Sequence, residues 1–124
     1  MLDFLSKNYH IVLILIVVGY LVFTFMGTAS DKDIRKHLEI PSVVVIDVRS
    51  AGEFRGGSFP SALNLAHSDI SSSVHRLPKD LKHPIIVFCA SGMRSRSAAS
   101  SLKSLGYTNV LNAGGYHNMM RFAK

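Results

Sequence analysis

Four short apolar runs, separated by more polar segments, mark the chain after position 40. They lie at 43–46, 62–65, 85–88 and 109–111. The first and third are uninterrupted and rich in β-branched residues, which is typical of strands buried in a parallel sheet. Helices or helical turns are predicted between and after the runs, at 50–54, 69–77, 94–105 and 114–122. Strands that alternate with helices predict an α/β fold, with a small parallel sheet covered by helices on both faces.

The N-terminal quarter of the chain has a different pattern. Residues 11–26 form an uncharged apolar run, and with its edges the segment 9–29 reaches the roughly 20 residues of a membrane-spanning helix. We therefore predict a short N-terminal tail at 1–8 and a transmembrane helix at 9–29. A capped helix at 30–38 then joins it to a globular domain at 39–124.

The charges around the apolar run indicate its orientation. Lys32, Arg35 and Lys36 follow the run, whereas Lys7 is the basic side chain before it. The positive-inside rule then places the globular domain in the cytoplasm, with the protein held in the inner cell membrane as a single-pass protein. The alternative is a signal peptide cleaved near Ala29, which leaves the domain in the periplasm.

Composition narrows the class of function. The 124 residues carry 14 Lys and Arg against 8 Asp and Glu, a formal net charge of +6, which suits an anionic substrate. No basic block or aromatic row indicates nucleic acid binding. The six histidines lack metal-ligand spacing, and one cysteine cannot form an intramolecular disulfide.

That cysteine, Cys89, is the candidate nucleophile. It directly follows the apolar run 85–88, at the edge of an α/β sheet where ligands bind. Arg94, Arg96, the N-terminus of the next helix and the loop amides all favour a thiolate at this place. The alternative is a buried structural cysteine, which is common among free cysteines.

Four sequence blocks resemble the rhodanese, or sulfurtransferase, domain family over about residues 39–122. The blocks are Ile46-Asp47-Val48-Arg49; Glu53-Phe54 with Phe59-Pro60 and Ala62-Leu63-Asn64; the loop from Cys89 to Arg94; and Gly106-Tyr107 with Val110 and Gly114-Gly115. A membrane helix before one such domain is similar to a bacterial, membrane-anchored subgroup.

The resemblance implies a sulfur transfer in two steps. Cys89 is expected to take a sulfane sulfur from a small anionic donor such as thiosulfate and to hold it as a persulfide, without another cofactor or a metal. It then passes the sulfur to cyanide, a thiol or a thioredoxin-like acceptor. The loop expected to bind the substrate and the persulfide consists of Ala90, Ser91, Gly92, Met93, Arg94 and Ser95.

The family pattern also assigns supporting roles. In the family, the positions of Arg49 and Glu53 form a structural ion pair. From its place at a strand end, Asp47 is expected either to take part in catalysis or, as the favoured interpretation, to orient loop backbone beneath Cys89. Gly114-Gly115 is expected to permit close backbone approach. Where the family usually has histidine, this chain has Ser58, which we do not expect to replace the imidazole as a hydrogen-bonding wedge.

Loop length separates two chemistries. Related phosphatases place five residues between cysteine and arginine, whereas four lie between Cys89 and Arg94, and this argues against phosphate chemistry. A non-catalytic rhodanese-like module that tethers a partner to the membrane is the remaining alternative. Its discriminating feature is that inactive copies usually lose the cysteine.

Overall fold

The computed structural model describes residues 2–124, with side-chain burial for residues 3–22 and 27–124. Within these residues, four parallel strands form one sheet in the order β2-β1-β3-β4. The strands are β1 (Val44–Asp47), β2 (Leu63–Asn64), β3 (Ile85–Phe88) and β4 (Val110–Asn112). All four apolar runs therefore become strands, as the sequence predicts.

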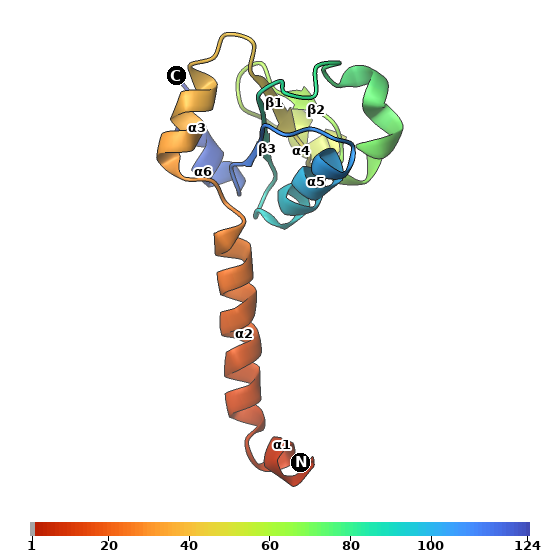
Figure 1. Cartoon of the computed structure of the whole chain (residues 1–124). Coiled ribbons are helices and arrows are strands. Elements are labelled where there is room, and N and C mark those ends of the chain that lie inside the picture. Colours follow the sequence, from red (N-terminus) through yellow and green to blue (C-terminus); the bar gives the residue numbers. More distant parts are fainter. Residues whose placement is uncertain (1) are drawn as a thin grey trace.

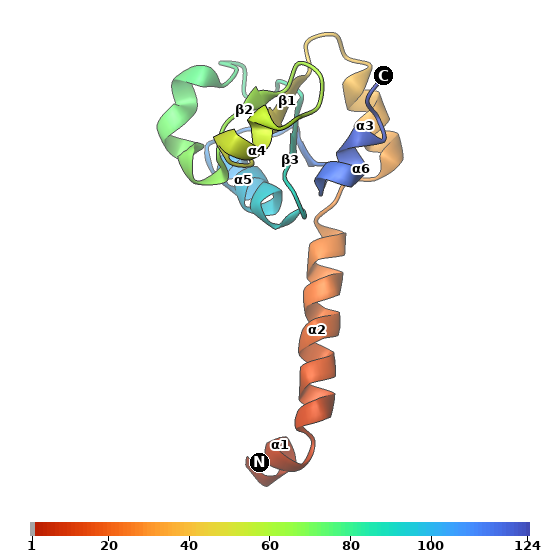
Figure 2. The same ribbon diagram turned by 180° about the vertical axis from the view of Figure 1, so that it is seen from behind.

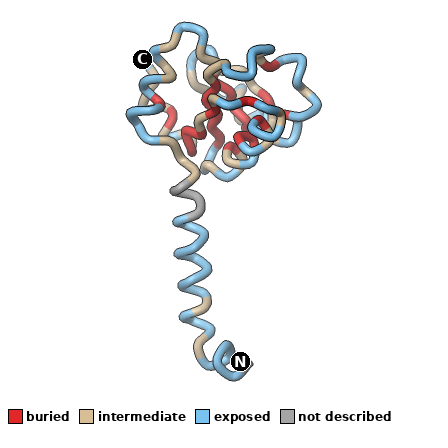
Figure 3. The backbone as a smooth tube through the Cα atoms, viewed as in Figure 1, coloured by how far each residue is buried: buried red, intermediate tan, exposed pale blue. Residues whose placement is uncertain are grey.

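Helices cover both faces of this sheet (Figures 1 and 2). Side chains alternate between the faces along a strand. Ile85 and Val87 of β3 accordingly pack in one core with helix α5 (Met93–Ser104), and Ile86 and Phe88 pack in a second core with α3 (Asp31–Leu38) and α6 (Tyr116–Met120). Figure 3 shows buried residues concentrated along the sheet and on α5. The predicted α/β fold is confirmed.

Helix α3 is part of this domain and does more than connect it to the N-terminal segment. Ser30 caps the helix, because its Oγ accepts a hydrogen bond of 3.2 Å from the backbone N–H of Asp33. Ile34 is fully buried against the second core. The packed body thus begins near residue 30, earlier than the boundary at 39 that the sequence predicts.

The segment predicted as one helix over 69–77 forms two 3₁₀-helices instead, η1 (His67–Asp69) and η2 (Ser71–Arg76). Ser73 inside η2 has a non-helical backbone. The physical reason is the serine run, since serine side chains bond to nearby backbone and compete with the α-helical ladder. Ser72 does so here, because its hydroxyl donates to the carbonyl of Asp69.

The apolar N-terminal run forms α2 (Tyr9–Met26), preceded by α1 (Leu2–Lys7), and Figure 1 shows α2 extending from the domain as a single rod. Its described large apolar side chains are exposed, apart from the partly buried Val12. Across the described part of the chain, no helix has the length and apolar character needed to cross a membrane. The predicted span at 9–29 is thus not supported; its side chains at 23–26 lie outside the described residues.

The geometry gives a reason why α2 is shorter than the helix predicted at 9–29. The 18 residues of α2 rise about 27 Å along the helix axis. The helix ends at Met26 because residues 27–29 lie beside β4 instead of continuing the helix. The backbone N–H of Ala29 donates to the carbonyl of Asn112 at 2.7 Å, which holds residues 27–29 beside β4.

Helix α4 (Ala51–Arg55) is short but well capped. Ser50 Oγ accepts a hydrogen bond from the Glu53 N–H, and the Glu53 carboxylate accepts one from the Ser50 N–H, both at 3.2 Å. This capping box satisfies two backbone donors at once. It also fixes Glu53 in a position that faces the cysteine loop.

Candidate active site

Cys89 lies where β3 ends, at the carboxyl edge of the sheet. Its backbone N–H donates to the carbonyl of Gly114 at 3.1 Å, so the residue is fixed to the segment that follows β4. The Cys89 side chain is fully buried. The sulfur atom therefore lies at the bottom of the loop rather than on its rim.

The loop turns back over the sulfur at Gly92. Gly92 has a φ of 102°, in the region that favours glycine, and its N–H donates to Cys89 Sγ at 2.9 Å. Helix α5 begins at the next residue, Met93, and its 12 residues direct the positive end of the helix dipole towards the loop. A negative charge on Sγ is stabilised by both features.

Ser95 lies beneath the sulfur as the third residue of α5. Its buried Oγ lies 3.4 Å from Cys89 Sγ, 3.0 Å from the Gly92 carbonyl and 3.4 Å from the Gly114 carbonyl. One hydroxyl thus links the sulfur, the turn and the segment after β4.

The far wall of the loop is held by the segment after β4. The Tyr116 N–H donates to the Ala90 carbonyl at 3.1 Å, and Ser91 pairs with Gly115 in an isolated β-bridge. A Cβ at Gly115 would lie 2.8 Å from the Ala90 oxygen, closer than real contacts allow. The expected close backbone approach at Gly114-Gly115 is therefore present.

Arg94 reaches out of the loop to Glu53 on α4. Its Nη1 and Nη2 donate to Oε1 and Oε2 at 2.8 and 3.1 Å. These two bonds are the main reason that the pKa of the Glu53 carboxyl is lowered to about 2. The hydrogen bond from the Ser50 backbone N–H is the next largest cause. The same pair raises the pKa of Arg94, and the nearby Cys89 sulfur raises it further.

The expected Arg49–Glu53 ion pair is wrong, since each residue has another partner. Arg49 is buried and binds Asp47, with Nη2 2.7 Å from Oδ2. This bond raises the pKa of Arg49. The reason is proximity at the strand end, because residues 47 and 49 lie on one turn whereas Glu53 is held by its capping box and Arg94.

The expected role of Asp47 beneath Cys89 stays a prediction; in the structure Asp47 Oδ1 orients the backbone that follows β1, because it accepts a hydrogen bond of 3.0 Å from the Arg49 N–H. Its carboxylate accepts hydrogen bonds from Arg49 and from the Ser58 hydroxyl, the latter at 2.7 Å. Ser58 thus does supply a hydrogen bond at the position where the family usually has histidine. Arg49 Nη2 donates to the Gly57 carbonyl at 2.6 Å, and the guanidinium lies 4.5 Å from the Tyr116 ring centre. Through these contacts, Asp47 and Arg49 hold the end of β1 against Gly57 and Ser58 and against Tyr116.

Two contacts around the loop were not found from the sequence. Tyr20 on α2 donates its hydroxyl to Met93 Sδ at 2.7 Å, and Asn112 Oδ1 accepts from the Gly114 N–H at 2.9 Å. No sequence signal joins Tyr20 to Met93, which lie 73 positions apart. Within residues 2–124, no group of three or more His, Cys, Asp or Glu could hold a metal ion.

Comparison with known proteins agrees with this geometry. The family described as "Rhodanese-like domain" matches residues 30–121. A sulfurtransferase of Allochromatium vinosum is 36% identical over 73 residues, covering 59% of this chain and 66% of that protein. A human thiosulfate:glutathione sulfurtransferase is 30% identical over 106 residues, covering 75% of this chain and 92% of that protein.

Coverage varies among the relatives. A tRNA uridine(34) hydroxylase of Buchnera aphidicola is 31% identical over 90 residues, which are 69% of this chain but only 29% of that protein. Among solved structures, the human single-domain sulfurtransferase TSTD1 superposes with a TM-score of 0.65 at 29% identity, covering 79% of this chain and 98% of that one. The sheet, the cysteine loop and the family match over residues 30–121 together show that the chain belongs to the rhodanese-like domain family.

Proposed function

We propose that this protein is a sulfurtransferase that carries the transferred sulfur as a persulfide on Cys89. The observation that carries the proposal is the hydrogen bond of 2.9 Å from the Gly92 N–H to Cys89 Sγ, at the start of a 12-residue helix. A backbone donor and a helix N-terminus both favour negative charge on sulfur. The names of the two sulfurtransferase relatives support the same reaction class.

The reaction balances in two displacements. The Cys89 thiolate attacks the outer sulfur of thiosulfate, a new S–S bond forms, and the old S–S bond breaks so that sulfite leaves with the electron pair. An acceptor nucleophile, such as cyanide or a thiolate, then attacks the outer sulfur of the persulfide and releases the Cys89 thiolate. No external oxidant or reductant is needed.

The loop supplies the binding groups for both steps. The Gly92 N–H already bonds to Cys89 Sγ, and we expect the other loop amides from Ala90 to Arg94 to bind the incoming sulfur, since preorganised amides stabilise developing charge well. Arg94 attracts an anionic donor while Glu53 holds its side chain in place. Thiosulfate is the proposed donor, and a thiol such as glutathione or a thioredoxin-like protein is the proposed acceptor.

One observation favours a non-catalytic module instead. The Cys89 side chain is fully buried, which also fits a structural cysteine. The two roles are separated by intact-protein mass spectrometry after treatment with thiosulfate. Sulfur transfer predicts a gain of one sulfur atom that Cys89→Ser removes, whereas a correctly folded protein that gains no sulfur from any sulfane donor would have only the module role.

The proposed location is the cell membrane, with the domain on the cytoplasmic side. Support comes from the uncharged run 11–26, from the exposed apolar side chains of α2, and from the basic residues that follow the run. Carbonate extraction of membranes, followed by labelling of introduced surface cysteines from either side, tests it. Recovery of a shortened chain in the periplasm would favour cleavage near Ala29 instead.

A further inference from the structure

A polar cavity lies between α5, β4 and the segment that leads into α3. Its volume is about 450 Å³, within the range of sites that take small molecules. The lining includes Arg96 and Lys103 from α5, Asn112 and Leu111 from β4, and Asp33 from α3. Cys89 does not line it, so this cavity is separate from the persulfide site.

Asn112 gives this cavity the character of a built site. The residue is only 6% exposed, yet its Nδ2 has no hydrogen-bond partner among the described residues. Its orientation is fixed, because Oδ1 accepts from the Gly114 N–H at 2.9 Å. A buried N–H donor without a partner is costly, and a ligand oxygen at this place removes the cost.

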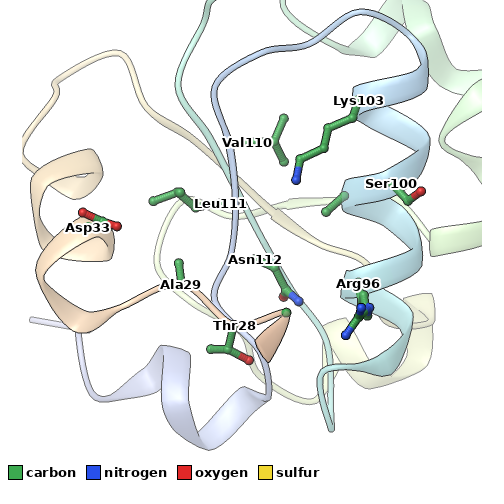
Figure 4. A pocket seen from close by; sticks show the side chains of 11 residues that line it. Thr28, Ala29, Asp33, Arg96, Ser100, Lys103, Val110, Leu111 and Asn112 are labelled. Atoms are coloured by element: carbon green, nitrogen blue, oxygen red, sulfur yellow. The ribbon is translucent and has the colours of Figure 1, made fainter. Parts of the chain in front are cut away.

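The charges around the cavity are arranged with opposite signs on opposite sides. Figure 4 shows Arg96 and Lys103 on α5 to one side of β4 and the carboxylate of Asp33 on α3 to the other. Arg96 and Lys103 are seven positions apart, so they share one face of the helix. Val110 and Leu111 supply an apolar floor between the two charged sides.

The geometry points to a binding site for a zwitterionic, amino-acid-like ligand such as a short peptide. In this arrangement the ligand's carboxylate binds between Lys103, Arg96 and the Asn112 amide, and the ligand's ammonium group faces Asp33. A purely anionic ligand fits less well, because Asp33 repels it. The site also adjoins the cysteine loop through Gly114. The Gly114 N–H donates to Asn112 Oδ1, and the Gly114 carbonyl accepts a hydrogen bond from the Cys89 N–H.

The test is an NMR titration of the full-length chain in a neutral detergent. The probe is S-methylglutathione, whose γ-glutamyl end is an amino-acid zwitterion, whose glycine end carries a second carboxylate and whose blocked thiol cannot accept sulfur. We expect saturable shifts of the Asn112 side-chain amide and of the Leu111 backbone amide. Binding should persist in Cys89→Ser, so this result does not depend on the sulfur-transfer proposal.

Matched substitutions separate the possible ligand classes. Lys103→Met and Asp33→Asn should each weaken binding about tenfold, as expected for loss of a charged hydrogen-bond partner. Lys82→Met, at an exposed lysine outside the cavity lining, should leave binding unchanged.

Inorganic phosphate serves as the purely anionic probe. If phosphate binds as well as the peptide and Asp33→Asn tightens that binding, the zwitterion assignment is wrong. Absence of saturable shifts at Asn112 with the peptide, or shifts confined to the Cys89 loop, would also overturn the proposal.

Discussion

Arg94 and Glu53 form a two-point hydrogen-bonded ion pair, 2.8 and 3.1 Å long, between the cysteine loop and α4. Such a fork fixes the direction of a guanidinium as well as its position. The Arg94 side chain is thus already ordered at the edge of the cysteine loop. Since both side chains are about one-third exposed, we assign the pair chiefly a positioning role.

Glu53→Gln should therefore lower kcat/KM for thiosulfate by about tenfold, because Arg94 loses its orientation. Arg94→Gln should cost at least as much. The double variant should be no worse than Arg94→Gln alone, because Glu53 acts through Arg94. Steady-state kinetics of all three variants checks this, and fully additive losses would show that Glu53 acts independently.

The same pair predicts a pH dependence of stability. The pKa of folded Glu53 is about 2, below its ordinary value of 4.5, so its contribution is complete above 4.5 and is lost as the pH falls towards 2. The difference in unfolding free energy between the native protein and Glu53→Gln should shrink over this interval. Denaturant unfolding at several pH values measures it; a difference that stays constant down to pH 2 would contradict the assignment.

The buried pair of Asp47 and Arg49 should matter much more for stability. Asp47→Asn leaves the buried Arg49 charge without its partner, and we expect a loss of about 3–5 kcal/mol in unfolding free energy. Asp31→Asn is the control, because Asp31 pairs with Arg121 on the exposed surface. Urea unfolding should show little change for Asp31→Asn; equal effects of the two substitutions would contradict this account.

Backbone conformation at Gly92 should be essential for the loop. A side chain at its φ of 102° is strained by roughly 1–2 kcal/mol, so Gly92→Ala should destabilise the protein by about that amount. It should also slow persulfide formation at least about tenfold by moving the N–H away from the sulfur. Gly52→Ala in α4 is the control, since its Cβ would meet only one Arg55 atom, at 4.0 Å. Equal rates for both variants would argue against a role for the turn.

The lack of room for a side chain at Gly115 gives a separate prediction. Gly115→Ala should push the Ala90 carbonyl away, because the new Cβ would otherwise lie 2.8 Å from its oxygen. We expect the rate of sulfite release from thiosulfate to fall about tenfold or more while the circular dichroism spectrum is preserved. Gly19→Ala, where nothing lies within 4 Å, should keep the native rate. A native rate in Gly115→Ala would mean that the loop tolerates the displacement.

Local signals were sufficient to predict the sheet and the position of the cysteine. The run 85–88 is apolar without a break, and the structure makes it the strand β3 with the same limits. Gly92 and the following helix are likewise local features, and they place a turn and a helix N-terminus beside Cys89. For such elements, neighbouring residues in the chain carry most of the information.

Side-chain partners could not be predicted in the same way. Glu53 lies 41 positions from Arg94, and the choice between Arg49 and Arg94 depends on how α4 sits against the cysteine loop. The burial of Ile34 likewise needs the assembled sheet, so α3 resembled a connector in the sequence. The end of α2 is set by the contact of Ala29 with β4, which no apolar pattern reveals.

Transfer of a labelled sulfur atom tests the central claim most directly. Thiosulfate labelled in its outer sulfur should place one label per chain on Cys89, the only cysteine, and cyanide should then move that label into thiocyanate. Cys89→Ser should retain the fold and acquire no label. A native protein that stays unlabelled, or a Cys89→Ser variant that forms labelled thiocyanate at the native rate, would contradict the account.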